Sequence, residues 1–235
     1  MNTHLIKVII SHKYKFIFIN TFNTAGTSLE LYYSKFASIK DVLSPVFPDE
    51  PNHTPRNYLG LIHPFRESKK YNFSLKSRLK EFLLLRRFYS HMPAYLIKER
   101  IPRNIWNSYM KFCIERNPWD KSVSHFHMMK YVNQQEMVFN YYLYNSQLCH
   151  NYPLYADPFT QEVLVDLVIA YDRLNEELYA LFSELGVPIS NSLEIFSDPN
   201  LRTNGKPYQD YYSERTKEFI REKFKDEIDF MGFEF

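Results

Sequence analysis

Short apolar runs alternate with helix-spaced apolar positions along most of the chain. Three runs predict strands, at Tyr14 to Ile19, Lys111 to Glu115 and Val163 to Tyr171, with a helix start as the alternative for the last. Leu193 to Phe196 is a further short strand candidate. The first run is apolar at successive positions, which is typical of a strand buried on both faces.

Apolar positions at helical spacing predict helices between the strands. We expect them at Thr27 to Phe36, Ser74 to Tyr89, Ala94 to Arg100, from about Pro118, Glu136 to Leu148, Leu174 to Leu185 and Ser213 to Phe230. Residues 38–72, rich in Pro, Asn and His, predict a long irregular connection, which could form a lid or an acceptor-side wall.

Strands that alternate with helices predict an α/β protein with a mostly parallel central sheet flanked by helices. A chain of 235 residues fits one such domain, 1–235, with a variable loop at 38–72. Ligands in such folds bind outside the carboxyl ends of the strands.

The first strand leads into a candidate anion site. Residues 20–26 form a polar turn after the strand, and Thr27 and Ser28 read as a helix start. Unpaired N–H groups and the helix dipole favour an anion at such a start. Gly26, one of only five glycines, lies inside the turn. The sequence therefore predicts a site for a phosphate-bearing small molecule.

A second candidate anion site follows the second strand. Arg116 stands at the strand end, and Ser124 follows about two helical turns later, so both could reach one phosphate. The alternative is that Arg116 and Asp120 pair to hold a strand–helix corner. The first turn has one glycine and no lysine, unlike G-x-x-x-x-G-K-[ST], which disfavours a phosphoryl-transfer P-loop enzyme but leaves it as an alternative.

Together the two segments resemble sulfotransferases that use 3′-phosphoadenosine 5′-phosphosulfate (PAPS), in the branch that contains carbohydrate sulfotransferases. KFIFINTFNTAGTS resembles K-F-I-F-x-H-x-P-K-T-A-G-T-S, and FCIERNPWDKSVS resembles F-x-R-N-P-[YW]-D-R-x-x-S. Weaker likenesses occur in the same order as far as the closing FMGFEF. The resemblance implies a P-loop-like fold and transfer of a sulfuryl group to a hydroxyl of a carbohydrate or similar acceptor.

The resemblance also implies roles for particular residues. The 5′-phosphosulfate would lie against Thr24, Ala25, Gly26, Thr27 and Ser28, and the 3′-phosphate against Arg116 and Ser124. PAPS would be the co-substrate, and no metal would be required.

Two residues bear on catalysis. Asn23 stands where the family has a lysine that stabilises the leaving phosphate, and losing such a charge costs roughly 100- to 1000-fold in rate. A catalytically weakened protein that binds the nucleotide or a glycan is therefore an alternative. His91, in a family-like position, is the candidate base, or else a helix-start or core histidine. His53 and His63 are further candidates.

Composition limits the classes of partner that we expect. Net charge is +2, from 29 basic and 27 acidic side chains, so no nucleic-acid binding is expected. Two cysteines support neither a disulfide framework nor a zinc cluster. No apolar run approaches the roughly 18 residues of a membrane span, and no signal peptide is recognisable, so a cytoplasmic location is expected. The expected partner is a sulfate-accepting small molecule or glycan, while the oligomeric state stays open.

Overall fold

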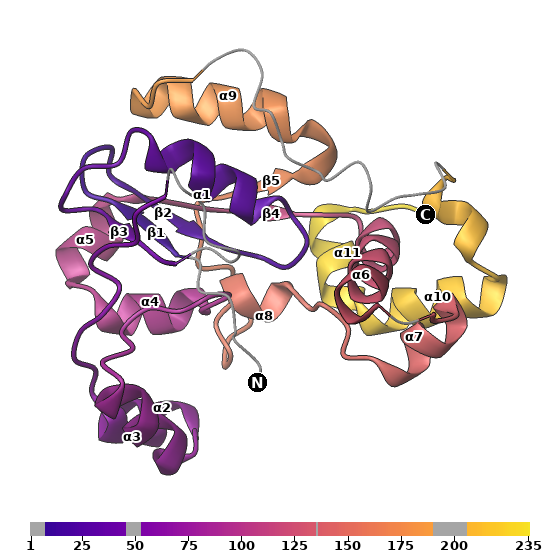
Figure 1. The fold of residues 1–235 in the computed structure, drawn as a ribbon, viewed down its shortest axis with the longest axis horizontal. Coiled ribbons are helices and arrows are strands. Elements are labelled where there is room, and N and C mark those ends of the chain that lie inside the picture. The colour runs from indigo at the N-terminus through magenta and orange to yellow at the C-terminus, as the bar shows by residue number, and fades with distance from the viewer. Residues whose placement is uncertain (1–7, 46–52, 135, 190–205) are drawn as a thin grey trace.

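The structure is a computed structural model that describes residues 8–45, 53–134, 136–189 and 206–235 (Figure 1). It is an α/β protein with one five-stranded sheet in the order β3-β1-β2-β4-β5. The strands are β1 (Ile9–Ser11), β2 (Phe16–Ile19), β3 (Val42–Leu43), β4 (Met110–Glu115) and β5 (Leu167–Ala170). The helices are α1 (Gly26–Ser34), α2 (Pro64–Tyr71), α3 (Leu75–Leu83), α4 (Ala94–Arg100), α5 (Arg103–Ser108), α6 (Pro118–Asn133), α7 (Phe139–Asn145), α8 (Tyr152–Tyr155), α9 (Leu174–Leu185), α10 (Glu214–Lys223) and α11 (Lys225–Met231).

The sheet is mixed, so the prediction of a mostly parallel sheet is wrong. Strands β2, β4 and β5 are parallel, but β1 is antiparallel to both β2 and β3. The prediction failed because β1 lies in an apolar run that was not recognised as a strand. A four-residue turn at 12–15, with Lys15 in the left-handed region (φ 56°), returns the chain along β1 as a hairpin. The Asp41 carboxylate accepts from the N–H groups of His12 and Lys13 and holds this turn.

Side chains alternate between the two faces of β2, as the pleat requires. Phe16 and Phe18 pack with α1 and α9 on one face. Ile17 and Ile19 pack on the other face with residues of α4, α5 and α8. Figure 1 shows these helices above and below the sheet, which therefore has no solvent-exposed face along β2.

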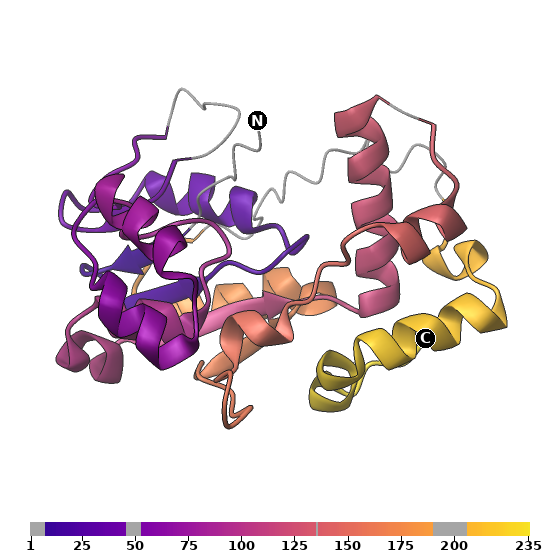
Figure 2. The same ribbon diagram turned by 90° about the horizontal axis from the view of Figure 1, so that it is seen from below.

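A third apolar cluster lies beyond the end of the sheet. It joins α6, α7 and α10 around Trp119, Phe126 and Phe224. Figures 1 and 2 both place this group at the end opposite α2 and α3. The carboxyl ends of β2 and β4 point toward it, so the predicted ligand edge lies between the sheet and this helical group.

Several predicted element boundaries need correction. The first helix is confirmed to within two residues, but the region 38–72 contains β3 and α2 and is not wholly irregular. Helix α3 ends at Leu83, because Leu85 is left-handed (φ 51°), and does not continue to Tyr89. The strand at 163–171 is limited to β5, and α7 is shorter than predicted. The final helix divides at Phe224, and Leu193 to Phe196 lie outside the described residues.

Within the described ranges, no helix combines the length and the apolar character that a membrane crossing requires.

Candidate functional site

The two predicted anion segments lie at the same edge of the sheet. Strands β2 and β4 are parallel neighbours, with Ile19 opposite Cys113, so the chain leaves both strands side by side. Thr21 donates its hydroxyl proton to the carbonyl oxygen of Ile114, which ties the first turn to β4. The sequence thus brings Asn20–Ser28 and Arg116–Ser124 together, as parallel strand ends require.

The turn before α1 has an irregular backbone. Asn23 and Ala25 have positive φ angles of 56° and 63°, on either side of the buried Thr24. A left-handed conformation is unfavourable for Ala, and such strain is concentrated at functional sites. Alternating backbone conformations of this kind aim successive N–H groups into one concavity that suits an anion.

The start of α1 is also suited to an anion. Helix α1 begins at Gly26, its N-cap Ala25 makes no side-chain cap, and the first turn carries no acidic residue. A helix start without a carboxylate keeps the positive end of its dipole unneutralised by its own sequence. Two hydroxyl-bearing residues were predicted to contact the 5′-phosphosulfate at this helix start. Thr27 is partly exposed and Ser28 is buried.

Gly26 permits a close approach to Asn20. A Cβ atom at Gly26 would lie 1.8 Å from Oδ1 of Asn20, which is itself buried. No side chain larger than hydrogen fits there without moving Asn20. The packing of the turn therefore requires a glycine at this position, whether or not a ligand is bound.

Arg116 joins the two segments. Its Nη1 donates to Oγ of Ser124 at 3.1 Å and to the carbonyl oxygen of Asn23 at 3.3 Å. Its Nε donates to Asp120 at 2.6 Å, and its guanidinium lies 4.3 Å from the ring centroid of Tyr171. The structure thus contains both the predicted Arg116–Ser124 pair and the alternative Arg116–Asp120 corner, and the two do not exclude each other.

Asn23 has a donor without a protein partner. Its Nδ2 is buried and makes no hydrogen bond within the described part of the chain. A buried donor without a partner is unfavourable, typically by about 1–3 kcal/mol, so a ligand acceptor at this position would be stabilising. The side chain therefore suits an anion by hydrogen bonding but supplies no charge.

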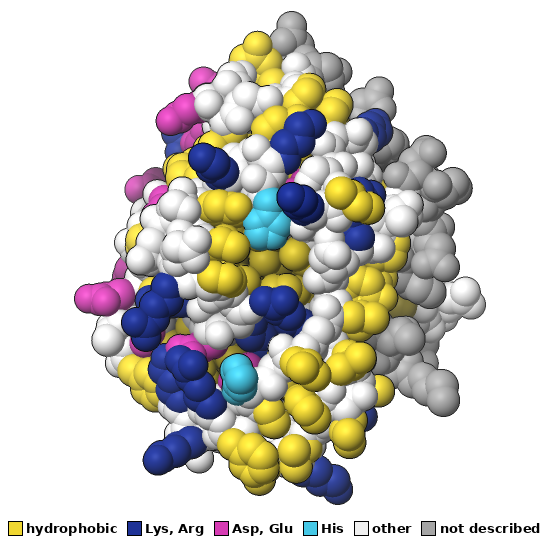
Figure 3. Space-filling view, turned by 90° about the vertical axis from the view of Figure 1, so that its left-hand side faces the viewer, with side chains coloured by type: hydrophobic (Ala, Val, Ile, Leu, Met, Phe, Trp, Pro, Cys, Tyr) yellow, Lys and Arg dark blue, Asp and Glu magenta, His cyan; other side chains and the backbone are white. Residues whose placement is uncertain are grey.

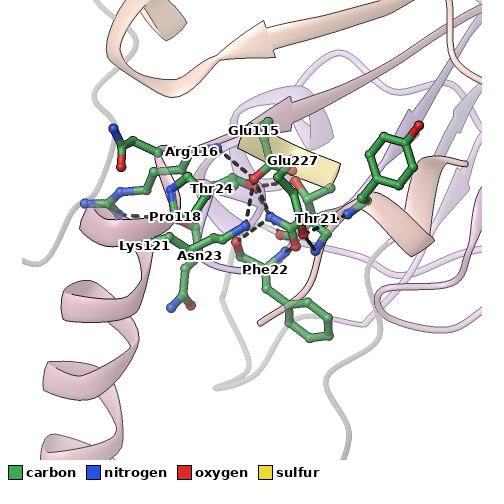
Figure 4. A network of polar contacts seen from close by, with 12 residues as sticks. Thr21, Phe22, Asn23, Thr24, Glu115, Arg116, Pro118, Lys121 and Glu227 are labelled. Atoms are coloured by element: carbon green, nitrogen blue, oxygen red, sulfur yellow. Dashed lines mark hydrogen bonds and ion pairs between the residues drawn. The ribbon is translucent and has the colours of Figure 1, made fainter. Parts of the chain in front are cut away.

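A buried carboxylate that sequence reasoning missed organises the floor of the site (Figure 4). Oε1 of Glu115 accepts from Nζ of Lys121 at 2.9 Å, from the N–H of Arg116 at 2.9 Å and from Nδ2 of Asn151 at 2.9 Å. Its Oε2 accepts from the hydroxyl of Tyr155 at 3.1 Å. Glu115 and Lys121 are both 0% exposed, so the pair is stabilised by these bonds and not by water.

Asn151 connects this carboxylate to the first turn. Its Oδ1 accepts from the N–H of Phe22 at 2.7 Å, and its Nδ2 also donates to the Phe22 carbonyl at 3.3 Å. Its own N–H donates to Glu227 on α11. The pKa of Tyr155 is raised by burial and then by the charge of Glu115, so the phenol keeps its proton and remains a donor. Sequence spacing did not identify these partners, because Phe22, Asn151 and Glu227 lie far apart in the chain and meet only in the fold.

His91 lies at the edge of the turn. Its ring stacks on Phe22 with centroids 3.8 Å apart, and its Nδ1 is 3.1 Å from the carbonyl oxygen of Asn20. A carbonyl can only accept, so this contact favours the tautomer with the proton on Nδ1 and the lone pair on Nε2, while Nδ2 of Asn20 lies 3.5 Å from the same Nδ1. The residue has a positive φ of 50°, and so it is not an ordinary helix-start histidine. His53, by contrast, is buried beside Glu30 of α1, and His63 lies before α2.

The described residues contain no cluster of three or more His, Cys, Asp or Glu side chains that could hold a metal ion. The site combines hydrogen-bond donors, the guanidinium of Arg116 with its Asp120 partner, the buried Glu115–Lys121 pair and the imidazole of His91. This set can bind an anionic ligand and accept a proton.

Fold and site together define an α/β protein with a polar strand–turn–helix segment next to an arginine at the carboxyl edge of its sheet. The sequence matches no known protein-family profile. It is 32% identical over 120 residues to an uncharacterized protein of Archaeoglobus fulgidus, in an alignment that covers 47% of this chain and 98% of that protein. The chain belongs to the same family as this archaeal protein.

The buried Glu115–Lys121 pair allows a test of the hydrogen-bond network that supports the site. Glu115→Gln should destabilise the protein by about 3–5 kcal/mol, because it leaves Lys121 buried without an acidic partner. Lys121→Met should cost less, since Glu115 keeps its other three donors. Urea unfolding measures both.

The pair Lys130–Glu136, 2.8 Å apart at the surface, is the matched control, and Lys130→Met should change the free energy of unfolding by less than about 1 kcal/mol. Equal effects at positions 121 and 130 would show that the buried network contributes little.

The close contact of Gly26 gives a second test. Gly26→Ala should destabilise the fold by about 1–3 kcal/mol through overpacking, and Asn20→Ala should relieve most of this in the double mutant. A thermal-unfolding double-mutant cycle measures the coupling. Gly186→Ala is the control, because nothing lies within 4 Å of its added Cβ, so it should show no coupling to Asn20→Ala. Additive effects of Gly26→Ala and Asn20→Ala would contradict the predicted contact.

Proposed function

We propose that this protein binds PAPS at the carboxyl edge of its sheet and transfers the sulfuryl group to a hydroxyl of a carbohydrate or similar acceptor. The observation that carries the proposal is the convergence of Arg116, Ser124 and the Asn23 backbone. A nucleotide phosphorylated at both ends needs two anion sites side by side, and the turn 23–28 and Arg116 would supply them. We further propose that β2, the turn and α1 form a P-loop-like unit.

Different residues would bind the two phosphates and assist the transfer. N–H groups of the turn and the start of α1 would hold the 5′-phosphosulfate, and Arg116 with Ser124 would hold the 3′-phosphate. In the transfer, the acceptor oxygen bonds to sulfur while the bond from sulfur to the 5′-phosphate oxygen breaks. Nε2 of His91 would take the acceptor proton, and the Nδ2 donor of Asn23 would hydrogen-bond the departing phosphate.

A second function is favoured by one specific observation, the neutral side chain at position 23. Arg116 is the single cation that we place at the bound phosphates, and Asp120 already neutralises part of its charge. A site with this charge balance can retain nucleotide affinity while it loses rate. The alternative is therefore a weakened sulfotransferase-like protein that binds the nucleotide or a glycan. A P-loop phosphotransferase is the third possibility.

The binding claim is tested at Arg116. Calorimetric titration with 3′-phosphoadenosine 5′-phosphate should show binding by the wild type. Arg116→Ala should weaken it by about 10- to 100-fold, since hydrogen bonds to a charged group are lost.

Arg103→Ala, which removes an exposed arginine on α5, is the matched control and should bind as the wild type does. Ser124→Ala, with a smaller expected loss, keeps the test valid if Arg116→Ala unfolds through loss of the Asp120 pair. Tight binding of ATP together with no binding of the bisphosphate would favour the phosphotransferase instead.

The catalytic claim is tested at position 23. Asn23→Lys should raise the rate of sulfate transfer by roughly 100- to 1000-fold, because an ammonium group stabilises the departing phosphate. Radiolabelled transfer to a panel of sugars measures it. Asn72→Lys is the control, since Asn72 has a similar positive φ of 53° but lies at the end of α2. If the wild type is inert and the lysine restores turnover, the protein is a nucleotide binder. If the lysine changes nothing, Asn23 does not lie at the leaving group.

A further inference from the structure

The unit formed by α2 and α3 exposes an apolar patch that the proposed function does not use. Its members, which we call the leucine patch, are exposed as follows: Leu59 52%, Leu61 68%, Phe65 68%, Leu83 78%, Leu84 50% and Leu85 45%. The two halves of the patch are joined by backbone pairing. The N–H of Gly60 donates to the carbonyl of Leu85 at 2.7 Å, and Leu59 pairs with Arg86. Contiguous exposed apolar surface of this kind marks an interaction site.

The same unit carries a strong net positive charge. Residues 64–87 contain eight Lys and Arg and two Glu, a net charge of +6, while the whole chain carries +2. Both glutamates face inward: Glu67 and Glu81 pair with Arg78 and Arg100. The exposed charges of the unit are therefore basic, namely Arg66, Lys69, Lys70, Lys76 and Lys80, of which Arg66 and Lys70 pair with Glu99 of α4.

A polar cavity of about 270 Å³ opens next to the patch at Leu61, and its charged lining residues are Arg66, Arg87 and Arg100 together with Glu67 and Glu99. The guanidinium of Arg87 donates to the carbonyl oxygen of Arg100 at 2.6 Å. No described carboxylate lies within ion-pair distance of Arg87, and burial, followed by the charge of Arg100, lowers its pKa. Arg66 and Arg100 pair with the two lining glutamates, so an anion would be stabilised at Arg87 in particular.

Figure 3 looks onto the end of the molecule that carries α2 and α3. Hydrophobic side chains gather in its lower part, and Lys and Arg side chains border them. Cores of protein–protein interfaces are depleted of lysine, whereas interfacial membrane binding combines leucine and phenylalanine with flanking lysine and arginine. The composition of this surface therefore fits a lipid surface better than a protein partner.

We propose that the α2–α3 unit binds the surface of an anionic phospholipid bilayer. The leucine patch enters the boundary between headgroups and acyl chains, and the surrounding Lys and Arg face lipid phosphates. Arg87 and its cavity receive the phosphate of one lipid. The proposal is independent of PAPS binding, since the proposed nucleotide site lies at the opposite end of β2 and β4 (Figure 1).

The full chain is tested by sedimentation with two kinds of vesicle, phosphatidylcholine alone and phosphatidylcholine with about 30% phosphatidylserine. The protein should bind the anionic vesicles, and binding should weaken with added salt. Leu83→Ser/Leu84→Ser should lower the partition coefficient at least about tenfold, because two exposed apolar groups no longer enter the lipid. Lys76→Glu/Lys80→Glu should lower it by a similar factor through charge.

Val138→Ser, at an exposed position (71%) before α7, is the matched control and should leave vesicle binding unchanged. Leu83→Trp supplies a direct probe, because its fluorescence should shift to the blue on vesicles and be quenched by brominated lipids. The two natural tryptophans are buried. The proposal is overturned if the wild type does not bind anionic vesicles, or if the serine variant binds as well as the wild type. A wild-type dimer that the serine variant dissociates, without vesicle binding, would assign the patch to a second copy of the chain.

Discussion

The site depends on one buried carboxylate, Glu115 at the carboxyl end of β4. Removing a charge from water is costly, and the cost is offset here by a buried lysine and three further donors. The lysine belongs to α6, and the other donors come from Arg116 between β4 and α6, from the segment before α8 and from α8 itself. Because each bond is directional, the carboxylate fixes how these elements meet at the end of the sheet. Asn151 extends the same hydrogen-bond network to the backbone of Phe22, so the network also positions the turn between β2 and α1.

Glu115 also determines the position of the next residue, Arg116. Arg116 follows Glu115, and its N–H is held by the Glu115 side chain, so the guanidinium projects along the first turns of α6. There it meets Asp120 and Ser124, one and two helical turns from Arg116, and reaches across to Asn23. The Asp120 contact orients the fork, and Nη1 lies toward the turn. A structural ion pair and a ligand-binding arginine are thus compatible roles for one side chain.

Sequence reasoning predicted the parts that depend on local chemistry. The strand–turn–helix around Gly26 and the Arg116–Ser124 helix follow from apolar runs, a glycine and an N-terminal proline, and their proximity follows from parallel strands. The hairpin that makes the sheet mixed was missed because β1 is only three residues long and its turn is held by the distant Asp41. Glu115 gave no signal because its partners at positions 121, 151 and 155 converge only in the fold. The leucine patch was hidden because Leu83–Leu85 read as a continuation of a helix, whereas the helix ends at Leu83 and leaves these leucines exposed.

The central claim is that the turn and Arg116 form one anion site at the carboxyl edge of the sheet. The most direct measurement is a titration of the isotopically labelled protein with 3′-phosphoadenosine 5′-phosphate, followed by NMR of backbone amides and of the Arg116 side chain. We expect saturable shifts of the amides of residues 23–28 together with Nε–H of Arg116, and unchanged amides in α2 and α3. Shifts confined to other parts of the chain, or movement of the turn without Arg116, would contradict it.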